Sequence, residues 1–175
     1  MASKKLIMSA TLLSRTLGRI AHQISEKNEA TRDVVLIGIQ RGGVHLASRL
    51  SVALEKLWEH TVPVGQLDVS MHRDDIDQRI PASIQPTVLP FHLDGKVVVL
   101  VDDVLFSGRT IRAAMDALND FGRPRAIQLA VLIDRGHRQL PIRPDFVGKE
   151  LPTSLQERVE VLLKESDSED AVYLA

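Results

Sequence analysis

The sequence of 175 residues has no cysteine, few aromatic residues and no long apolar run. Without cysteine the chain cannot form a disulfide, a thiolate metal site or a cysteine nucleophile. Its longest aliphatic runs, at 34–37 and 97–101, are far shorter than the roughly 18–20 residues that a membrane-spanning helix needs. The N-terminus lacks the apolar stretch of a signal peptide. We therefore expect a cytoplasmic protein with no membrane partner.

An excess of charge of one sign is also missing. The chain has 22 basic and 23 acidic residues, so its net charge of −1 gives no overall basic field that would attract nucleic acid. The charges are nevertheless segregated, because residues 1–25 carry four basic side chains and no acid, whereas residues 157–170 contain six acids. With 44% hydrophobic residues, the composition predicts one folded domain spanning residues 1–175.

The hydrophobic periodicity alternates between strand and helix along the chain. Apolar residues recur at helical spacing over residues 9–26 and again from 44 to 57, and a third helix is expected over about 110–121. Short β-branched runs at 34–39, 96–101 and 126–133 predict buried strands, and residues 64–71 alternate like a strand. This order predicts an α/β fold with a mostly parallel sheet flanked by helices. Ligands bind such sheets beyond the carboxyl ends of the strands.

One long segment, from about residue 72 to 95, shows neither periodicity. It contains Pro81, Pro86 and Pro90 together with Asp74, Asp75 and Asp77. Long loops in compact domains are commonly functional, so we expect a mobile flap here.

The most informative stretch runs from residue 97 to 110. Five apolar residues lead into Asp102 and Asp103, and a short turn then enters a helix through Ser107-Gly108-Arg109-Thr110. Unpaired amides at a helix N-terminus, with a glycine and hydroxyl groups, suit a phosphate monoester. Taken alone, the turn could be a common helix cap and the acids a solvated strand end. The combination instead predicts a ribose 5-phosphate pocket.

These features resemble the signature of type I phosphoribosyltransferases, which use phosphoribosyl diphosphate (PRPP). Gln40-Arg41-Gly42-Gly43 follows the first buried strand and is similar to the diphosphate loop of that family. The resemblance implies a non-proline cis peptide between Gln40 and Arg41. It also implies substrate contacts from two segments, namely Arg41 and Gly42 in this loop, and Val104, Leu105, Phe106, Ser107, Gly108, Arg109, Thr110 and Ile111 around the turn.

Two further stretches, residues 71–75 and 134–145, resemble the bacterial PyrR family, and the likeness covers about residues 9–163. Members of that family regulate pyrimidine operon expression and also convert uracil and PRPP to UMP and diphosphate. The alternative is a dedicated phosphoribosyltransferase that does not bind RNA and that uses a purine or another nucleobase. In purine enzymes an aspartate typically occupies the position of Phe106, and this chain lacks it.

The resemblance assigns roles within the catalytic site. Asp102 and Asp103 would orient the ribose and the waters of Mg²⁺, which is bound mainly through PRPP and diphosphate rather than by a protein metal cluster. Arg73 on the flap would close over the diphosphate, although an ordinary exposed arginine is an equally good interpretation. Uracil would meet the chain near Arg135 and Val159, under a hood built from about residues 135–175.

The resemblance also implies that the chain binds the leader mRNA of the pyrimidine operon in a UMP-dependent manner, causing transcription attenuation. Residues 135–149 carry a local net charge of +3, from four basic residues against Asp145. A homodimer or higher homo-oligomer would present the surface to an RNA hairpin. At Gly18 the chain departs from the family, in which threonine is common. The residues that match the RNA-binding positions of the family are Arg19, His22, Lys27, His137, Arg138, Arg143 and Lys149.

Overall fold

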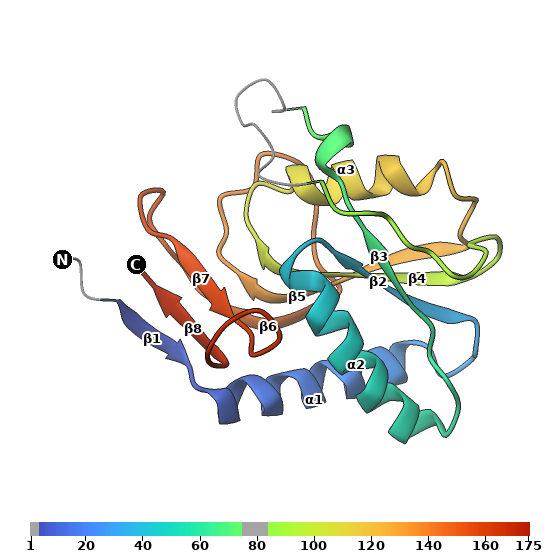
Figure 1. Ribbon diagram of the computed structural model, residues 1–175, viewed down its shortest axis with the longest axis horizontal. Helices are drawn as coiled ribbons and strands as arrows, with labels where there is room; N and C mark the ends of the chain where they lie inside the picture. Colours follow the sequence, from blue (N-terminus) through green and yellow to red (C-terminus); the bar gives the residue numbers. More distant parts are fainter. Residues whose placement is uncertain (1–3, 75–83) are drawn as a thin grey trace.

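A computed structural model describes residues 4–74 and 84–175, with a central sheet of five parallel strands (Figure 1). The strand order is β3-β2-β4-β5-β6. This arrangement confirms the predicted α/β class. The strands comprise β2 (Val34–Ile39), β3 (Val64–Leu67), β4 (Val97–Leu105), β5 (Ala126–Asp134) and β6 (Phe146–Glu150).

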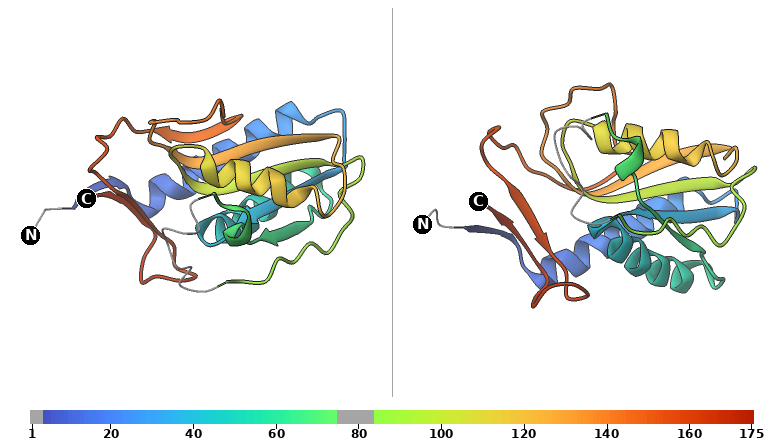
Figure 2. Two further views of the ribbon diagram at one scale, coloured as in Figure 1. Left: turned by 90° about the horizontal axis from the view of Figure 1, so that it is seen from above. Right: turned by 45° about the horizontal axis from the view of Figure 1, so that its top comes forward.

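Helices cover both faces of this sheet, as Figure 2 shows. Helices α1 (Ala10–Lys27) and α2 (Gly42–Trp58) pack on one face. Helix α3 (Arg109–Leu118) covers the other, next to the short 3₁₀ helix η1 (Ser70–His72). Because both faces are covered, every residue of β2 is buried. The continuous apolar runs of the sequence follow from this double coverage.

Side-chain hydrogen bonds fix both ends of α1. The Ser9 hydroxyl accepts a hydrogen bond from the Leu12 amide at 3.3 Å, which caps the first turn. At the other end, the buried Asn28 amide exchanges hydrogen bonds with the Gln128 amide at 2.9 and 3.1 Å. This reciprocal pair ties the end of α1 to β5, and so orients the exposed face of the helix relative to the sheet.

A second, smaller sheet stands beside the central one and contains the first and the last strand of the described residues (Figure 1). It is antiparallel, in the order β1-β8-β7, from β1 (Lys5–Met8), β8 (Ala171–Leu174) and β7 (Val159–Leu162). This sheet is the hood of the molecule. It differs from the expected hood in two respects, because residues 146–150 pair with β5 in the central sheet and the N-terminal strand pairs with β8.

Two strand boundaries also differ from the expectation. β4 continues through the acid pair to Leu105, because its ladder with β5 extends to the pair Leu105 and Asp134. β3 ends at Leu67 and is followed by η1. Residues 75–83 of the predicted flap lie outside the described residues. In residues 4–74 and 84–175, no helix is long and apolar enough to cross a membrane.

Candidate active site

The loop after β2 lies against the acid pair of β4. The expected non-proline cis peptide is present between Gln40 and Arg41. A side chain at Gly42 would place its Cβ 2.5 Å from a carboxylate oxygen of Asp103, and one at Gly43 would lie 2.2 Å from the Val101 carbonyl oxygen. Both glycines are therefore required by close approach. The loop predicted to bind diphosphate and the acids predicted to bind ribose are in direct contact.

The two acids have different surroundings. Asp102 is only 7% exposed and accepts a hydrogen bond from the Asp103 amide at 2.9 Å. Burial, followed by the neighbouring charge of Asp103, raises the pKa of Asp102 well above its ordinary value. Asp103 is half-buried and accepts from the Val104 amide at 2.8 Å. Asp103 is thus the carboxylate that solvent and ligand can reach, with Asp102 behind it.

The turn between β4 and α3 exposes backbone amides. Gly108 has a φ of 93°, in the left-handed region that favours glycine, and it is the N-cap residue of α3. No side chain from the described part of the protein caps this helix, although the Ser107 hydroxyl accepts from the Arg109 amide at 3.3 Å. The opening turn of α3 is therefore a suitable anion site. Leu105 and Ile111, on either side of the turn, are buried in the core.

Two arginines lie over this turn. The Arg73 guanidinium donates to the Thr110 hydroxyl at 3.2 Å, and its charge also acts on Asp102. Arg109 donates to the Gln139 side chain at 2.9 Å and pairs with Asp74. The structure therefore brings the predicted flap arginine to the predicted phosphate site.

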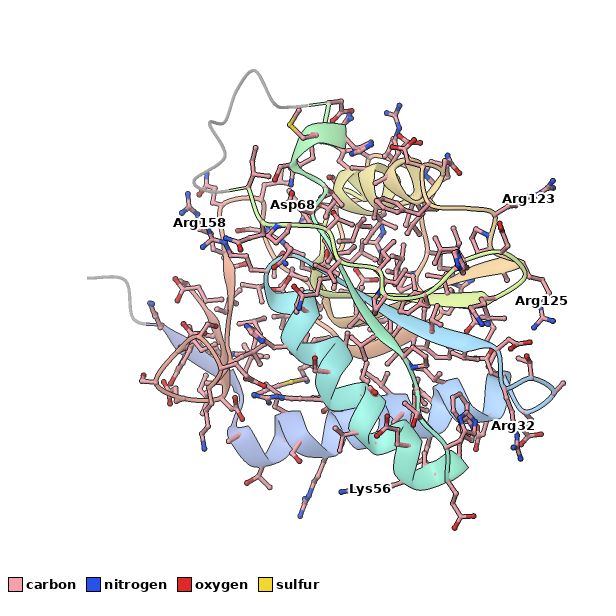
Figure 3. The ribbon with its side chains drawn as sticks, turned by 45° about the vertical axis from the view of Figure 1, so that its right-hand side comes forward. Arg32, Lys56, Asp68, Arg123, Arg125 and Arg158 are labelled. Atoms are coloured by element: carbon pink, nitrogen blue, oxygen red, sulfur yellow. The ribbon has the colours of Figure 1, made fainter. Side chains whose placement is uncertain are left out.

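Asp68, which follows β3, was not identified from the sequence. Figure 3 labels Asp68 among the side chains of the protein. The Asp68 carboxylate accepts hydrogen bonds from the Ser70 amide at 2.7 Å and the Gln85 amide at 2.6 Å. Burial raises the pKa of Asp68, but the hydrogen bonds from Ser70 and Gln85 outweigh it and lower the pKa below its usual value. Asp68 thereby joins the two limbs of the segment that carries Arg73. An aspartate shortly after a strand gives no distinctive sequence signal for this role.

The other side of the turn is built around Phe106 and Arg135. The Arg135 guanidinium lies 4.3 Å from the centroid of the exposed Phe106 ring. Arg135 is only 8% exposed, and its guanidinium donates to the Thr153 hydroxyl at 3.1 Å and the Ser154 carbonyl at 2.9 Å. An adjacent cavity of about 350 Å³ is lined by Asp134–His137 and Glu150–Thr153. Val159 on β7 and Val104 on β4 pack against one core cluster.

His137 and Arg138, which were predicted to contact RNA, are involved in internal contacts. The His137 ring meets the edge of Phe106, and its Nε2 lies 2.6 Å from the Thr153 carbonyl oxygen. Arg138 donates to both carboxylate oxygens of Asp134 at 2.9 and 2.6 Å, and to the Phe106 and Ile142 carbonyls. Burial raises the pKa of Asp134, but these bonds from Arg138 outweigh it and lower the pKa. Arg138 thus braces the phosphate turn.

The other predicted RNA contacts divide into engaged and available side chains. Arg19 donates to the Val147 and Gly148 carbonyls at 3.2 and 2.5 Å, and Lys27 pairs with Asp145 at 2.6 Å. Within the described residues, the side chains of His22, Arg143 and Lys149 are exposed and make no hydrogen bond or ion pair. Arg19 and Lys149 line one shallow hollow, whereas His22 lines the groove between α1 and α2.

The residues present suit a magnesium ion that is held mainly by its ligand. Within residues 4–74 and 84–175, no three His, Asp or Glu side chains are grouped as a metal site. The acid pair does supply carboxylate oxygens, which are the donors that Mg²⁺ prefers, at the edge of the diphosphate loop. An ion bound to diphosphate could be reached from there through its waters.

Comparison with known sequences finds close relatives over almost the whole chain. A family model described as the phosphoribosyl transferase domain matches residues 8–162. A relative from Chloroflexus aurantiacus, named bifunctional protein PyrR, is 57% identical over 175 residues, which is 99% of this chain and 96% of the relative. A protein of the same name from Streptomyces coelicolor is 59% identical over 163 residues, covering 93% and 84% of the two chains.

Comparison with solved structures finds the same fold at low sequence identity. A hypoxanthine-guanine phosphoribosyltransferase from Bacillus anthracis superimposes with a TM-score of 0.75 over 98% of both chains, at 19% identity. A hypoxanthine phosphoribosyltransferase from Staphylococcus aureus gives a TM-score of 0.66 at 17% identity, over 85% of this chain and 77% of the other. At these identities the likeness establishes the architecture alone.

Proposed function

Because this chain belongs to the phosphoribosyl transferase domain family and, within it, to the PyrR proteins, we propose that it has two activities. It transfers the phosphoribosyl group of PRPP to uracil, which gives UMP and diphosphate. It also regulates expression of the pyrimidine biosynthesis operon, by binding the leader mRNA in a UMP-dependent manner and so causing transcription attenuation.

One observation carries the enzymatic part. The diphosphate loop at Gly42, the Asp103 carboxylate and the uncapped turn at Gly108 lie together at the carboxyl edge of the central sheet. A ligand with a diphosphate, a diol and a terminal phosphate would place one of these groups at each of the three features. PRPP has all three.

The residues of this edge act mainly by positioning and by electrostatics. A bond forms between a ring nitrogen of uracil and the anomeric carbon of ribose, while the bond from that carbon to diphosphate breaks and diphosphate leaves with the electron pair. The uracil nitrogen gives up its proton to the departing diphosphate or to solvent. The turn from Ser107 to Thr110 holds the 5-phosphate, and Asp103 orients the ribose hydroxyls. Arg41 and Arg73 meet the leaving diphosphate, whose developing negative charge they stabilise.

A magnesium ion fits this site as a companion of the substrate. When bound, it neutralises part of the diphosphate charge, which makes diphosphate a better leaving group. Asp102 and Asp103 would hold it through its waters and the ribose hydroxyls. Asp103 is the more exposed of the two and is therefore the carboxylate that such an ion would reach first.

The nucleobase is assigned to the side of the site that contains Phe106 and Arg135. The planar pair of the Phe106 ring and the Arg135 guanidinium gives uracil a flat wall. Backbone groups near Arg135 and Val159 would read its polar edge.

RNA binding is assigned to the surface formed by α1 and β6. The exposed basic side chains of Arg143, Lys149 and His22 are available for phosphate contacts. A structured hairpin suits such a surface better than a single strand, because the chain has only 3% aromatic residues for base stacking.

We further propose a homodimer or higher homo-oligomer and a cytoplasmic location. Sedimentation equilibrium tests the oligomeric state.

A transferase assay tests the enzymatic proposal. The purified protein is supplied with PRPP, Mg²⁺ and radiolabelled uracil, hypoxanthine or guanine. Formation of labelled UMP is expected, with purine turnover at least about a hundredfold lower in kcat/KM. Turnover of a purine but not of uracil would instead identify a purine phosphoribosyltransferase.

A gel-shift assay tests the regulatory proposal. The probe is the leader RNA of the pyrimidine operon from the same genome, with its antisense strand as the control. Binding of the leader is expected to tighten when UMP is added. Equal binding of both strands with and without UMP would contradict specific, nucleotide-dependent recognition.

A further inference from the structure

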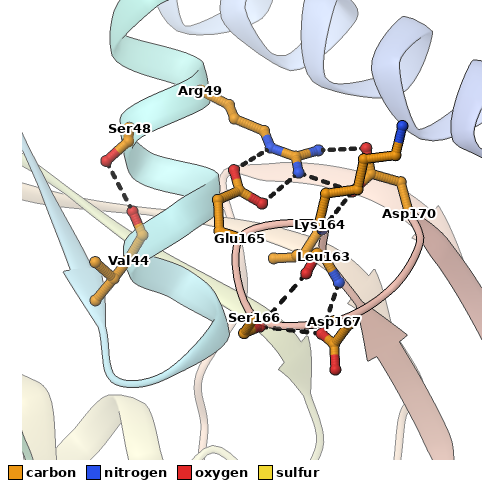
Figure 4. Close-up of polar contacts among 9 residues, drawn as sticks. All are labelled: Val44, Ser48, Arg49, Leu163, Lys164, Glu165, Ser166, Asp167 and Asp170. Atoms are coloured by element: carbon orange, nitrogen blue, oxygen red, sulfur yellow. Dashed lines mark hydrogen bonds and ion pairs between the residues drawn. The ribbon is translucent and has the colours of Figure 1, made fainter.

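Two carboxylates of the acidic C-terminal segment form ion pairs with Arg49 of α2. Arg49 donates from Nε and Nη2 to the two carboxylate oxygens of Glu165, at 2.8 and 2.5 Å. It also donates from Nη1 and Nη2 to the two oxygens of Asp170, at 3.1 and 2.8 Å. Figure 4 shows the guanidinium between these carboxylates, which belong to the loop joining β7 to β8. We call these three residues the hood clamp.

The loop around the clamp is itself well braced. The Lys164 amide donates to the Asp170 carboxylate at 2.9 Å, and the Leu163 amide donates to the Asp167 carboxylate at 2.9 Å (Figure 4). Hydrogen bonds from Arg49 are the largest influence on the pKa of Glu165 and of Asp170, and both pKa values are lowered. A fully ionised clamp on a braced loop fixes orientation as well as distance.

The clamp joins the two parts of the molecule that contribute to the proposed site. Arg49 lies seven residues, or about 10 Å along a helix, from Gly42 in the diphosphate loop. The clamped loop leads from β7, which begins at Val159, into β8. Val159 packs against the same core cluster as Val104 of β4, just before the phosphate turn. The clamp therefore connects the helix that begins at the diphosphate loop to the strand that contains Val159.

We propose that Arg49 is a positioning residue for the nucleobase, which acts by holding the hood at a fixed angle to α2 through Glu165 and Asp170. This inference rests on the proposed transferase function. The diphosphate loop is positioned separately, by the close approach of Gly42 to Asp103 and of Gly43 to Val101. Binding of uracil should therefore depend on the clamp, and binding of PRPP should not.

Steady-state kinetics of Arg49→Gln tests the proposal. Glutamine keeps much of the length of the side chain but loses the charge and the bidentate geometry. We expect the KM for uracil to rise at least fivefold while the KM for PRPP changes less than twofold. Arg32→Gln is the matched control, because Arg32 is exposed, makes no ion pair among the described residues and should leave both constants unchanged.

Two further variants keep the test decisive if Arg49→Gln is poorly folded. Glu165→Gln removes one charge from an exposed loop residue and should raise the KM for uracil by a smaller factor than Arg49→Gln does. Arg49→Lys keeps the charge and should give a KM for uracil between those of the wild type and Arg49→Gln. An unchanged KM for uracil in a folded clamp variant would overturn the proposal, as would an equal rise in both KM values. A wild-type protein that does not use uracil would refute the proposed function instead.

Discussion

The carboxyl edge of the central sheet and the arginine-rich segment 135–149 differ in how they are built. The edge relies on backbone groups, with Gly42 against Asp103 and an uncapped turn at Gly108. The segment relies on side chains, and two of them, Arg138 and the neighbouring His137, are engaged by backbone carbonyls of the same chain. Backbone geometry is fixed by local sequence, whereas the availability of an arginine is decided by distant partners. A motif therefore predicts the first region more fully than the second.

The largest effect is expected at Asp103, the accessible carboxylate of the edge. Asp103→Asn removes the charge that orients the ribose hydroxyls, so kcat/KM for uracil and PRPP should fall about 10²–10³-fold. The assay for labelled UMP measures this. RNA binding should remain close to that of the wild type, and an equal loss of both activities would show that the two regions are not separate.

The next effect concerns the contact between Gly42 and Asp103. Gly42→Ala would place a Cβ 2.5 Å from the carboxylate oxygen and displace it, so kcat should fall about 10²-fold. Gly18→Ala, on α1, is the matched control, because no atom lies within 4 Å of the added Cβ. The control should retain activity. If both variants behave alike, close packing at the edge is not needed for turnover.

A moderate effect on stability is expected at Arg138. Arg138→Ala leaves the carboxylate of Asp134 without its main partner and removes a donor from the Phe106 carbonyl. Because both side chains are mostly buried, the free energy of unfolding should fall by about 1–3 kcal/mol. Urea unfolding measures it. Arg143→Ala should change it by less than about 0.5 kcal/mol, and a similar loss in both variants would refute the bracing role.

Arg143, whose substitution should hardly change stability, is expected to matter for RNA binding. Its exposed side chain makes no hydrogen bond or ion pair within the described residues, so it is available to a phosphate of the RNA. Arg143→Ala should therefore weaken the binding of leader RNA about tenfold and reduce the slope of log K against log salt by about 1. UMP synthesis should be unaffected. Filter binding at several salt concentrations measures both quantities. An unchanged salt slope would remove Arg143 from the RNA surface.

The smallest expected effect is a pH dependence from Asp102. Its pKa is raised in the folded protein, so the folded state binds a proton more tightly than the unfolded chain does. The stabilisation is complete below the ordinary value of 3.8 and is lost as the pH rises through the raised pKa. The stability of Asp102→Asn relative to wild type should therefore increase with pH over that window. A difference independent of pH would contradict the assignment.

The sequence predicts the central sheet and its motifs because they depend on local patterns. The runs at 34–39 and 97–101 are buried on both faces, and the turn at Ser107–Thr110 follows from one glycine and two hydroxyls. The hood is harder to predict because its three strands have four residues each and pair across the full length of the chain. The bracing by Asp68 and Arg138 is also nonlocal, since their partners are set by the tertiary fold.

Backbone amide shifts of the isotope-labelled protein test the central claim most directly, with UMP and uridine as the two ligands. The ligands differ only in the 5-phosphate, so the difference between their spectra isolates its binding site. The account predicts that UMP, but not uridine, shifts the amides of residues 107–110 strongly. Amides at this turn that do not respond to UMP would contradict it.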